Sequence, residues 1–294
     1  MDKILPSLPN EIKIAAKERR LLIFLGAGIS CAAGLPSWEE VKGILLKKCR
    51  DKFVEDPIRF QEISNMPYYE CFSEVFRIDR DTYNKELNKA LSCNDEQLDI
   101  FKKLINTIKK LNPCSIITTN VDDLLTRCGL YTPDKFRYRE QCCPQELRED
   151  KVFCLHGTKE NAVFNRFELV GLYGNPDFKN FLYNVFGSYS VLFLGYSFKD
   201  EALRETMRIN VYYQTQKEDY TFHYALLPSD AQINEILYQR QFGIRIIRYD
   251  NSKQNYENFI PTIESWTGVK PEAKKPRGKK DSRAQVPGRY EKIL

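Results

Sequence analysis

The chain has 294 residues, of which 42% are hydrophobic, so it can bury the core of one large domain, and no run approaches the roughly 18 to 20 consecutive apolar residues of a membrane span. Its formal net charge of +5 comes from residues 270–294, which hold nine Lys/Arg against three Asp/Glu, whereas residues 1–269 hold 36 basic and 37 acidic residues; charge does not indicate a nucleic-acid-binding face on the body. The nine cysteines argue against a secreted disulfide framework because their number is odd, so we expect reduced thiols. The N-terminal residues lack the apolar stretch of a signal peptide, so we expect a cytoplasmic protein.

Six short apolar runs alternate with helical patterns along the chain. They cover residues 21–25, 114–119, 152–156, 190–196, 223–227 and 243–249. Runs of this length predict buried parallel strands, and their alternation with helices is typical of βαβ units. The sequence therefore predicts an α/β fold with a Rossmann-like, doubly wound parallel sheet, in which ligands bind at the carboxyl ends of the strands.

Two helices have recognisable starts. Ser37 followed by Glu40 predicts a capping box that opens a helix over residues 38–48. Asn94 followed by Gln97 predicts a second capping box before another helical pattern. These two helices flank a region of different character.

Residues 51–93 predict a helical insertion after the first strand and helix. The region has no convincing strand, and its apolar and aromatic residues recur at helical spacing. We expect these residues to form the core of the insertion rather than to line a ligand site. They are Tyr69, Phe72, Val75, Phe76, Leu87 and Leu91.

The chain is predicted to form one domain over residues 1–269. Residues 129–150 predict a loop-rich connection between the second and third strands. Residues 270–294 are rich in Pro, Lys and Arg and poor in large apolar residues, so burial cannot offset their ordering entropy. We expect a disordered tail there, and any contact with nucleic acid or membrane through this tail alone.

A glycine-rich turn, Gly26-Ala27-Gly28-Ile29-Ser30, follows the first predicted strand. Glycines let the backbone approach a pyrophosphate, free N–H groups and the next helix dipole favour an anion, and the Ser30 hydroxyl is a further donor. The pattern lacks GxGxxG and the lysine of GxxxxGK[ST], which disfavours an ATP-hydrolysing P-loop. Phosphate binding is therefore one interpretation, and a tight turn without a ligand is the other.

Polar residues follow the second predicted strand. Asn120 ends the run Thr118-Thr119-Asn120, and Asp122 would lie in the first turn of a helix. The Asn120 amide can bond a ribose hydroxyl or hold a water at this strand end. Alternatively, Asn120 caps the helix and Asp122 complements its dipole. The two interpretations are compatible.

The third and fourth strand ends carry a histidine and a glycine-serine turn. His156 is a candidate general base because the ordinary imidazole pKa is near 6.5, the alternative being a satisfied core histidine. Gly195 permits close approach of a ligand, and Ser197 can meet a phosphate or a ribose. We expect Asp200 to cap the next helix. His223 begins its strand at the remote end, and we expect it to be structural.

The ordered set GAGIS with GLP, TTN-x-D, LHG and LGYS resembles the sirtuin superfamily over roughly residues 20–250. More closely, it is similar to the sirtuin-like NAD hydrolases of bacterial antiviral defence and of related animal proteins. The resemblance implies a loop over the NAD phosphates, polar residues near the nicotinamide ribose, and a catalytic base. These roles carry over to Gly26, Ala27, Gly28 and Ser30 for the phosphates; to Asn120 and Asp122 for the ribose; to His156 for the base; and to Ser197 for a further cofactor contact.

Departures from the deacylase pattern change the expected acceptor. Protein deacylases of the superfamily continue the loop as a GIPDFR-type sequence, whereas this chain has Ser37, Trp38 and Glu39 in place of Asp, Phe and Arg. They also carry a zinc ribbon with two CxxC pairs. No CxxC occurs here, and the adjacent Cys142 and Cys143 cannot replace a two-pair tetrahedral site, so we expect no zinc ribbon and no metal.

The resemblance implies an NAD glycohydrolase that cleaves its substrate NAD to nicotinamide and ADP-ribose, with Asn120 and His156 at the reacting centre. Such an enzyme would act as an NAD-depleting defence or immune effector. We expect a homo-oligomer, latent until oligomerisation or a protein partner activates it. Two alternatives stay open: a non-catalytic sensor or filament-forming protein that binds NAD or ADP-ribose, and an NAD-dependent deacylase or ADP-ribosyl transferase.

Overall fold

The computed structural model describes residues 5–129, 147, 152–159, 162–163, 166–214, 223–251, 256 and 258–268. Most of the predicted connection over residues 129–150, including Cys142 and Cys143, lies outside this part of the chain. The predicted tail over residues 270–294 lies outside it as well. Where the domain ends and what the tail does therefore stay predictions.

A single parallel sheet forms the centre of the fold, with the strand order β3-β2-β1-β4-β5-β6. This is the strand order of Rossmann folds, so the predicted α/β, doubly wound class is confirmed. Each of the six predicted runs contributes a strand, although β3 ends two residues before His156. The strands are β1 (Leu21–Leu25), β2 (Ser115–Thr118), β3 (Val152–Cys154), β4 (Ser190–Leu194), β5 (His223–Pro228) and β6 (Ile244–Tyr249).

Helices connect the strands and extend the fold beyond the sheet. Both predicted capping boxes are confirmed: Ser37 with Glu40 opens α3, and Asn94 with Gln97 opens α7. The helices are α1 (Asn10–Lys17), α2 (Ala27–Ala32), α3 (Trp38–Cys49), the 3-10 helix η1 (Arg50–Phe53), α4 (Pro57–Asn65), α5 (Tyr68–Ile78), α6 (Arg80–Ala90), α7 (Asp95–Lys109), α8 (Leu124–Arg127), α9 (Arg166–Gly174), α10 (Pro176–Ser188), α11 (Glu201–Gln214), α12 (Glu235–Phe242) and α13 (Phe259–Trp266).

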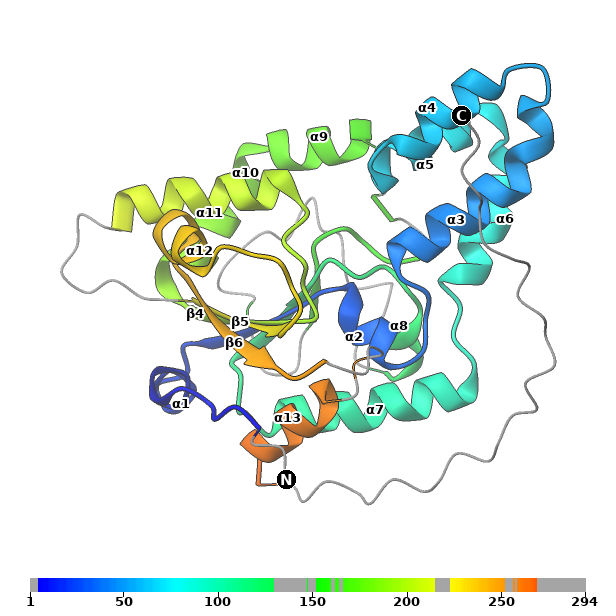
Figure 1. Ribbon diagram of the computed structural model, residues 1–294. Coiled ribbons are helices and arrows are strands. Elements are labelled where there is room, and N and C mark those ends of the chain that lie inside the picture. The colour runs from blue at the N-terminus through cyan, green and yellow to red at the C-terminus, as the bar shows by residue number, and fades with distance from the viewer. Residues whose placement is uncertain are drawn as a thin grey trace.

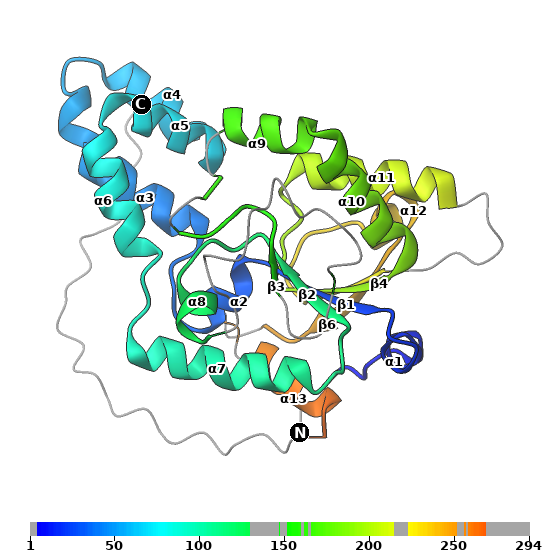
Figure 2. The same cartoon turned by 180° about the vertical axis from the view of Figure 1, so that it is seen from behind.

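The sheet is covered on both faces, as Figures 1 and 2 show from opposite sides. Successive side chains of β1 point to opposite faces: Ile23 joins a core with α1, α7 and α13, whereas Phe24 joins a core with α9, α10, α11 and α12. All five residues of β1 are buried, because helices cover the strand on both faces. The uninterrupted apolar runs in the sequence are the consequence.

The helices α3 to α6 form a unit beside the sheet with a core of its own (Figure 1). Phe72 and Val75 of α5 pack there with Leu45 of α3 and Leu87 of α6, so the predicted helical insertion is confirmed. The expectation for Tyr69 was wrong. Its side chain does not join this core but lines a cavity between the insertion and the sheet. One face of α5 packs on the core of the insertion, and the face that carries Tyr69 is turned toward the cavity.

The strand order places a crevice between β1 and β4. The chain turns to one side of the sheet after β1 and to the other after β4, so the connections diverge at this point. Parallel strands end at the same edge, and the loops after β1 and β4 therefore lie side by side there. This topological switch point is where open α/β sheets bind their ligands.

Candidate functional site

A cavity of about 740 Å³ lies at this crevice. Its walls come from the loops after β1 and β4, from the residues that follow β2 and β3, and from helices α5 and α9. Five of the predicted site residues line it: Ala27, Gly28, His156, Gly195 and Ser197. The carboxyl edge of the sheet has thus brought together residues that are up to 170 positions apart in the sequence.

The glycine loop after β1 packs directly on the loop after β4. The Gly26 amide donates to Leu194 O at 3.0 Å, and the Gly28 amide donates to Gly195 O at 2.8 Å. A methyl group at Gly28 would lie 2.8 Å from the Cα atom of Gly195, and one at Gly26 would lie 2.5 Å from the Cα atom of Tyr196. The glycines are therefore required by contact between two backbones, whatever ligand binds beside them.

Gly195 is constrained twice. Its φ of +66° lies in the left-handed region, and a methyl group there would lie 2.5 Å from the Ile29 amide nitrogen. The two loops consequently form one rigid floor, on which Ala27 and Gly28 face the cavity from one side and Ser197 from the other.

Three of the predicted residues lie beneath this floor rather than in the cavity wall. The Ser30 hydroxyl donates to Asp122 Oδ2 at 2.6 Å, and the Asn120 amide donates to Ser30 Oγ at 2.9 Å and to Gly26 O at 3.1 Å. All three side chains are buried, and none of them lines the cavity, although Thr119 and Val121 do. Whether Asn120, Asp122 and Ser30 meet a ligand stays a prediction.

The Asp122 carboxyl is in an unusual electrostatic state. Burial raises the pKa of Asp122 to about 6, against the opposing effect of the hydrogen bonds from Ser30 and from the Leu124 amide. The Leu124 amide donates to Asp122 Oδ1 at 3.2 Å, so this carboxyl contacts the first residue of α8, whereas Asn120, the cap in one interpretation of the sequence, bonds Gly26 and Ser30 with its side-chain amide. The network holds the end of β2 against the glycine loop.

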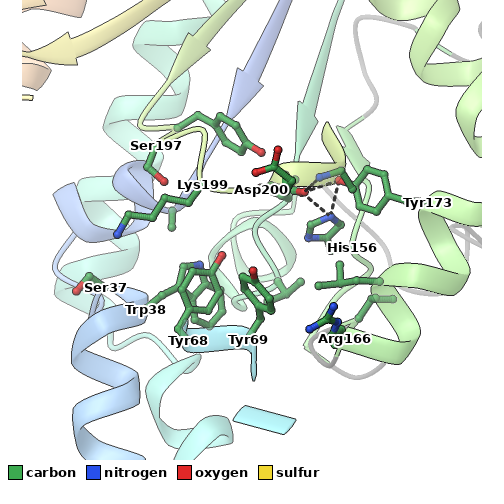
Figure 3. A pocket seen from close by; sticks show the side chains of 18 of the residues that line it. Ser37, Trp38, Tyr68, Tyr69, His156, Arg166, Tyr173, Ser197, Lys199 and Asp200 are labelled. Carbon is green, nitrogen blue, oxygen red and sulfur yellow. Dashed lines mark hydrogen bonds and ion pairs between the residues drawn. The ribbon is translucent and has the colours of Figure 1, made fainter. Parts of the chain in front are cut away.

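His156 lies in the turn after β3 and lines the cavity. Its Nε2 atom is 3.1 Å from the Tyr173 hydroxyl, which itself donates to Asp200 Oδ2 at 2.7 Å (Figure 3). Burial lowers the pKa of His156, and the negative charge of Asp200 opposes that effect. The imidazole is therefore neutral at neutral pH, which is the state that can accept a proton.

His223 is at the opposite end of the sheet, at the start of β5. Burial lowers its pKa to about 4, and its Nδ1 accepts from the Val191 amide at 3.3 Å. It lies among the core residues Phe186 and Tyr224, far from the carboxyl edge. The geometry fits the expected structural role.

An aromatic wall from the helical insertion faces His156 across the cavity. Trp38 and Tyr68 stack with centroids 5.9 Å apart and an interplanar angle of 12°, and Tyr69 stands beside them (Figure 3). Neither Trp38 nor Tyr68 was expected in a site from the sequence. Trp38 was recognisable only as a departure from the deacylase loop, and the spacing of Tyr68 and Tyr69 along a helix carries no information on which of them faces a cavity.

Basic side chains line the same cavity. Lys199 approaches Glu39 with 3.5 Å between Nζ and Oε1, and Arg166 forms an ion pair with Glu70 of α5. Lys179 is a third basic residue in the lining. Four acidic residues line it too, so the cavity combines flat aromatic surface with charges of both signs: Glu39, Glu70, Asp200 and Glu201. The aromatic surface suits the rings of a ligand, and the basic groups suit its phosphates.

Tyr196 adds a polar group with no partner. Its side chain lines the cavity and is only 7% exposed, and within the described part of the chain its hydroxyl has no hydrogen-bond partner. An unpaired buried hydroxyl is unfavourable by about 1–3 kcal/mol, so such groups mark places where a ligand or a water completes the structure.

The described residues hold neither a candidate metal site nor a helix that could span a membrane. Across these ranges, no group of three or more His, Cys, Asp or Glu side chains is arranged to hold a metal ion. Within the same part of the chain, each helix is too short or too polar to cross a bilayer.

Comparison with known proteins agrees with this geometry. Residues 114–247 match the family model of the SIR2-like domain. These residues are therefore similar to the SIR2-like domain over somewhat less than half of the chain. The match begins at β2 and ends within β6, so it includes His156 and the loop after β4 but not the glycine loop after β1. SIR2-like domains use NAD, which makes NAD the ligand class that this family indicates.

The chain is also similar to Defense-associated sirtuin 2 of Bacillus subtilis, with 23% identity over 262 residues. The alignment covers 81% of this chain but 24% of the relative, so the chain spans about a quarter of the length of the protein it matches. The sirtuin-like resemblance seen in the motifs is therefore confirmed.

Proposed function

We propose that this chain is an NAD glycohydrolase that cleaves NAD to nicotinamide and ADP-ribose. The observation that carries the proposal is the meeting of His156 with the two glycine loops around one cavity at the switch point of a sirtuin-like sheet. Histidine is the side chain best suited to accept a proton at neutral pH, and the switch point is the dinucleotide site of Rossmann folds.

The residues present fit NAD. A volume of about 740 Å³ lies within the roughly 300–1,000 Å³ that is usual for small-molecule sites. The glycine floor offers backbone to a pyrophosphate, Lys179 and the ion-paired Lys199 and Arg166 offer basic groups, and the Tyr196 hydroxyl, unpaired among the described residues, offers a donor. The aromatic wall of Trp38 and Tyr68 offers flat surface to a ring.

NAD itself supplies a good leaving group, because nicotinamide is bound to ribose as a cationic pyridinium and departs neutral. The protein therefore needs no acid. His156 accepts a proton from the attacking oxygen, a role that contributes roughly 10²–10⁴ in rate. The cavity walls hold the reacting bond beside His156, and Asn120 holds Gly26 and Ser30 and so supports the floor. Direct contact between Asn120 and the ribose is part of the proposal and stays a prediction.

The absence of the deacylase loop pattern favours water as the acceptor. Ser37 caps α3 through its hydroxyl, which the Glu40 amide bonds at 3.3 Å, and Trp38 stacks on Tyr68. Ser37 thus fixes the start of the helix that carries Trp38, and Trp38 forms part of the aromatic wall. This supports hydrolysis over transfer to an acyl-lysine.

Incubation of the purified protein with NAD, followed by chromatography of the products, tests the proposal. Free nicotinamide and ADP-ribose are expected, and His156→Ala should lower the rate roughly 10²–10⁴-fold with an unchanged thermal unfolding midpoint. An acyl- or protein-linked ADP-ribose would instead indicate a transferase. A protein that binds NAD but releases no products, even when partner proteins are added or the protein concentration is high, would instead be a sensor.

A place in antiviral defence is the corresponding biological proposal. It is supported by the similarity to Defense-associated sirtuin 2, and it puts the chain in the cytoplasm as a homo-oligomer that a partner activates. Nucleic-acid or membrane contact is proposed only for the basic tail. Light scattering of the purified chain with and without NAD would test oligomerisation, and cellular NAD measured during phage infection would test the defence role.

A further inference from the structure

We propose that Tyr173 and Asp200 position His156 as the general base, by holding its Nε2–H and leaving Nδ1 free to take the proton. This inference rests on the proposed function and deepens it. The three residues come from separate parts of the chain: the turn after β3, helix α9, and the residue that precedes α11. Figure 3 shows the three side chains converging at one side of the cavity.

The direction of the hydrogen bonds assigns the tautomer. The Tyr173 hydroxyl has a single hydrogen, which it donates to Asp200 Oδ2 at 2.7 Å. The Tyr173 oxygen can therefore only accept from His156 Nε2, which is 3.1 Å away. Asp200 Oδ2 lies 3.7 Å from the same nitrogen, beyond hydrogen-bond distance but within that of an ion pair with a protonated imidazole. The proton of the neutral imidazole thus stays on Nε2, and the lone pair is on Nδ1.

Asp200 is itself held in place by the backbone. Its Oδ1 atom accepts from the amides of Ala202 at 3.1 Å and Leu203 at 3.2 Å, which is the bonding of a helix N-cap. The cap that the sequence predicted is therefore present, and it uses one carboxylate oxygen only. The other oxygen is directed at Tyr173, so the start of α11 sets the position of the charge.

Tyr173 is equally constrained. The side chain is 6% exposed, and its ring packs edge-on against Phe178 of α10 with centroids 5.2 Å apart and against His156 at 5.9 Å. A buried phenol in this packing has little freedom to rotate away. The pair Tyr173–Asp200 therefore fixes both the plane and the tautomer of the imidazole.

Electrostatics give the pair a second effect. When His156 accepts a proton it becomes a cation in a buried place, and the Asp200 charge stabilises that cation. The other charged groups and tyrosines that line the same cavity are Glu39, Tyr68, Tyr69, Glu70, Arg166, Lys179, Tyr196, Lys199, Glu201 and Tyr256. Arg166 pairs with Glu70 and Lys199 with Glu39, so Asp200 is the charge in direct contact with the imidazole.

The test uses a variant that keeps the cap. Asp200→Asn retains an oxygen for the Ala202 and Leu203 amides but removes the charge, and Tyr173→Phe removes the hydroxyl. The matched control is Asp56→Asn, since Asp56 caps α4 in the same way through the Arg59 amide and does not line the cavity. Thermal unfolding midpoints of Asp200→Asn and Asp56→Asn are expected to remain close to that of the unsubstituted protein.

The kinetic readout is kcat for NAD cleavage as a function of pH. Asp200→Asn and Tyr173→Phe should lower kcat by about 10–100-fold with little change in KM, the usual effect of removing the partner that orients a functional side chain. In Asp200→Asn the acidic limb of the profile should move to lower pH, because the charge that raises the His156 pKa is gone. A drop in rate without a shifted limb would mean a structural role only and would overturn the proposal.

A readout independent of activity separates this inference from the proposed function. The chain has two histidines, so nitrogen-detected NMR of the imidazoles resolves His156 from His223. The Nε2–H tautomer is expected for His156 in the unsubstituted protein, with a mixture of tautomers in Tyr173→Phe and a lower pKa in Asp200→Asn. If the spectra are as expected but no nicotinamide is released, the proposed function fails and the positioning stands. If both variants keep the original tautomer and pKa, the positioning is refuted even in an active enzyme.

Discussion

Substitution of Gly195 by alanine should destabilise the protein through two separate effects. The backbone effect comes from φ of +66°, where an L side chain is unfavourable by about 1–2 kcal/mol. The packing effect comes from a methyl group 2.5 Å from Ile29 N and 2.8 Å from Gly28 C, both backbone atoms that cannot rotate away, and overpacking of this kind typically costs about 1–3 kcal/mol. The sum is about 2–5 kcal/mol, a large part of a typical 5–15 kcal/mol stability.

Gly129→Ala is the matched control for this prediction. Gly129 has φ of +75°, yet none of the described residues lies within 4 Å of the position that a methyl group would take. Its substitution should therefore show the backbone effect alone. Urea unfolding of both variants measures the difference, and equal unfolding free energies would refute the claim that the two loops are in backbone contact. The added methyl group in Gly195→Ala would also push the loop after β1 away from the loop after β4. Because Gly28 and Ser197 of these loops line the cavity, the rate of NAD cleavage should fall as well.

Two further predictions concern buried polar groups. Tyr196→Phe removes a hydroxyl without a partner among the described residues, so the stability of this variant should be unchanged or higher while its KM for NAD rises about tenfold. Tyr213→Phe, at an exposed tyrosine of α11, is the control. An unchanged KM in Tyr196→Phe would show that the Tyr196 hydroxyl does not contact the ligand. Burial raises the pKa of Asp122 from 3.8 to about 6, so between these pH values the folded protein keeps a proton that the unfolded chain releases. The unfolding free energy should therefore fall by up to roughly 3 kcal/mol as the pH rises from 3.8 to about 6. Asp122→Asn should abolish that fall in urea unfolding, and an identical pH dependence in the variant would contradict the assignment.

The strands were predictable because each is buried on both faces. Helices cover both sides of the sheet, so a run such as Leu21–Leu25 has to be apolar throughout, and this is visible without knowing any contact. Helix starts were predictable for a local reason: the Ser37–Glu40 and Asn94–Gln97 capping boxes form within one turn. Both kinds of signal depend on residues that are close in sequence.

Orientation of side chains was harder to predict. Tyr69 has the spacing of a core residue of α5 but faces the cavity, since the helix is buried on one side by its own unit and on the other by α9. Asn120 stands at a predicted strand end, yet its amide is turned beneath the glycine loop toward Gly26 and Ser30. In both cases the deciding neighbour is distant in sequence.

By itself, the sequence determined the class of fold, the strand ends and the set of motifs that marks a sirtuin-like protein. It also pointed to His156 and to the glycines, because residue type and position on a strand end are local properties. Only the tertiary structure decided that Gly28 and Gly195 are required for contact with each other, and that Trp38, Tyr68 and Tyr196 belong to the cavity. The contact of His156 and Tyr173 with Asp200 likewise joins two connections of the sheet, β3 to β4 and β4 to β5, and such a contact exists only once parallel strands have brought their carboxyl ends to one edge.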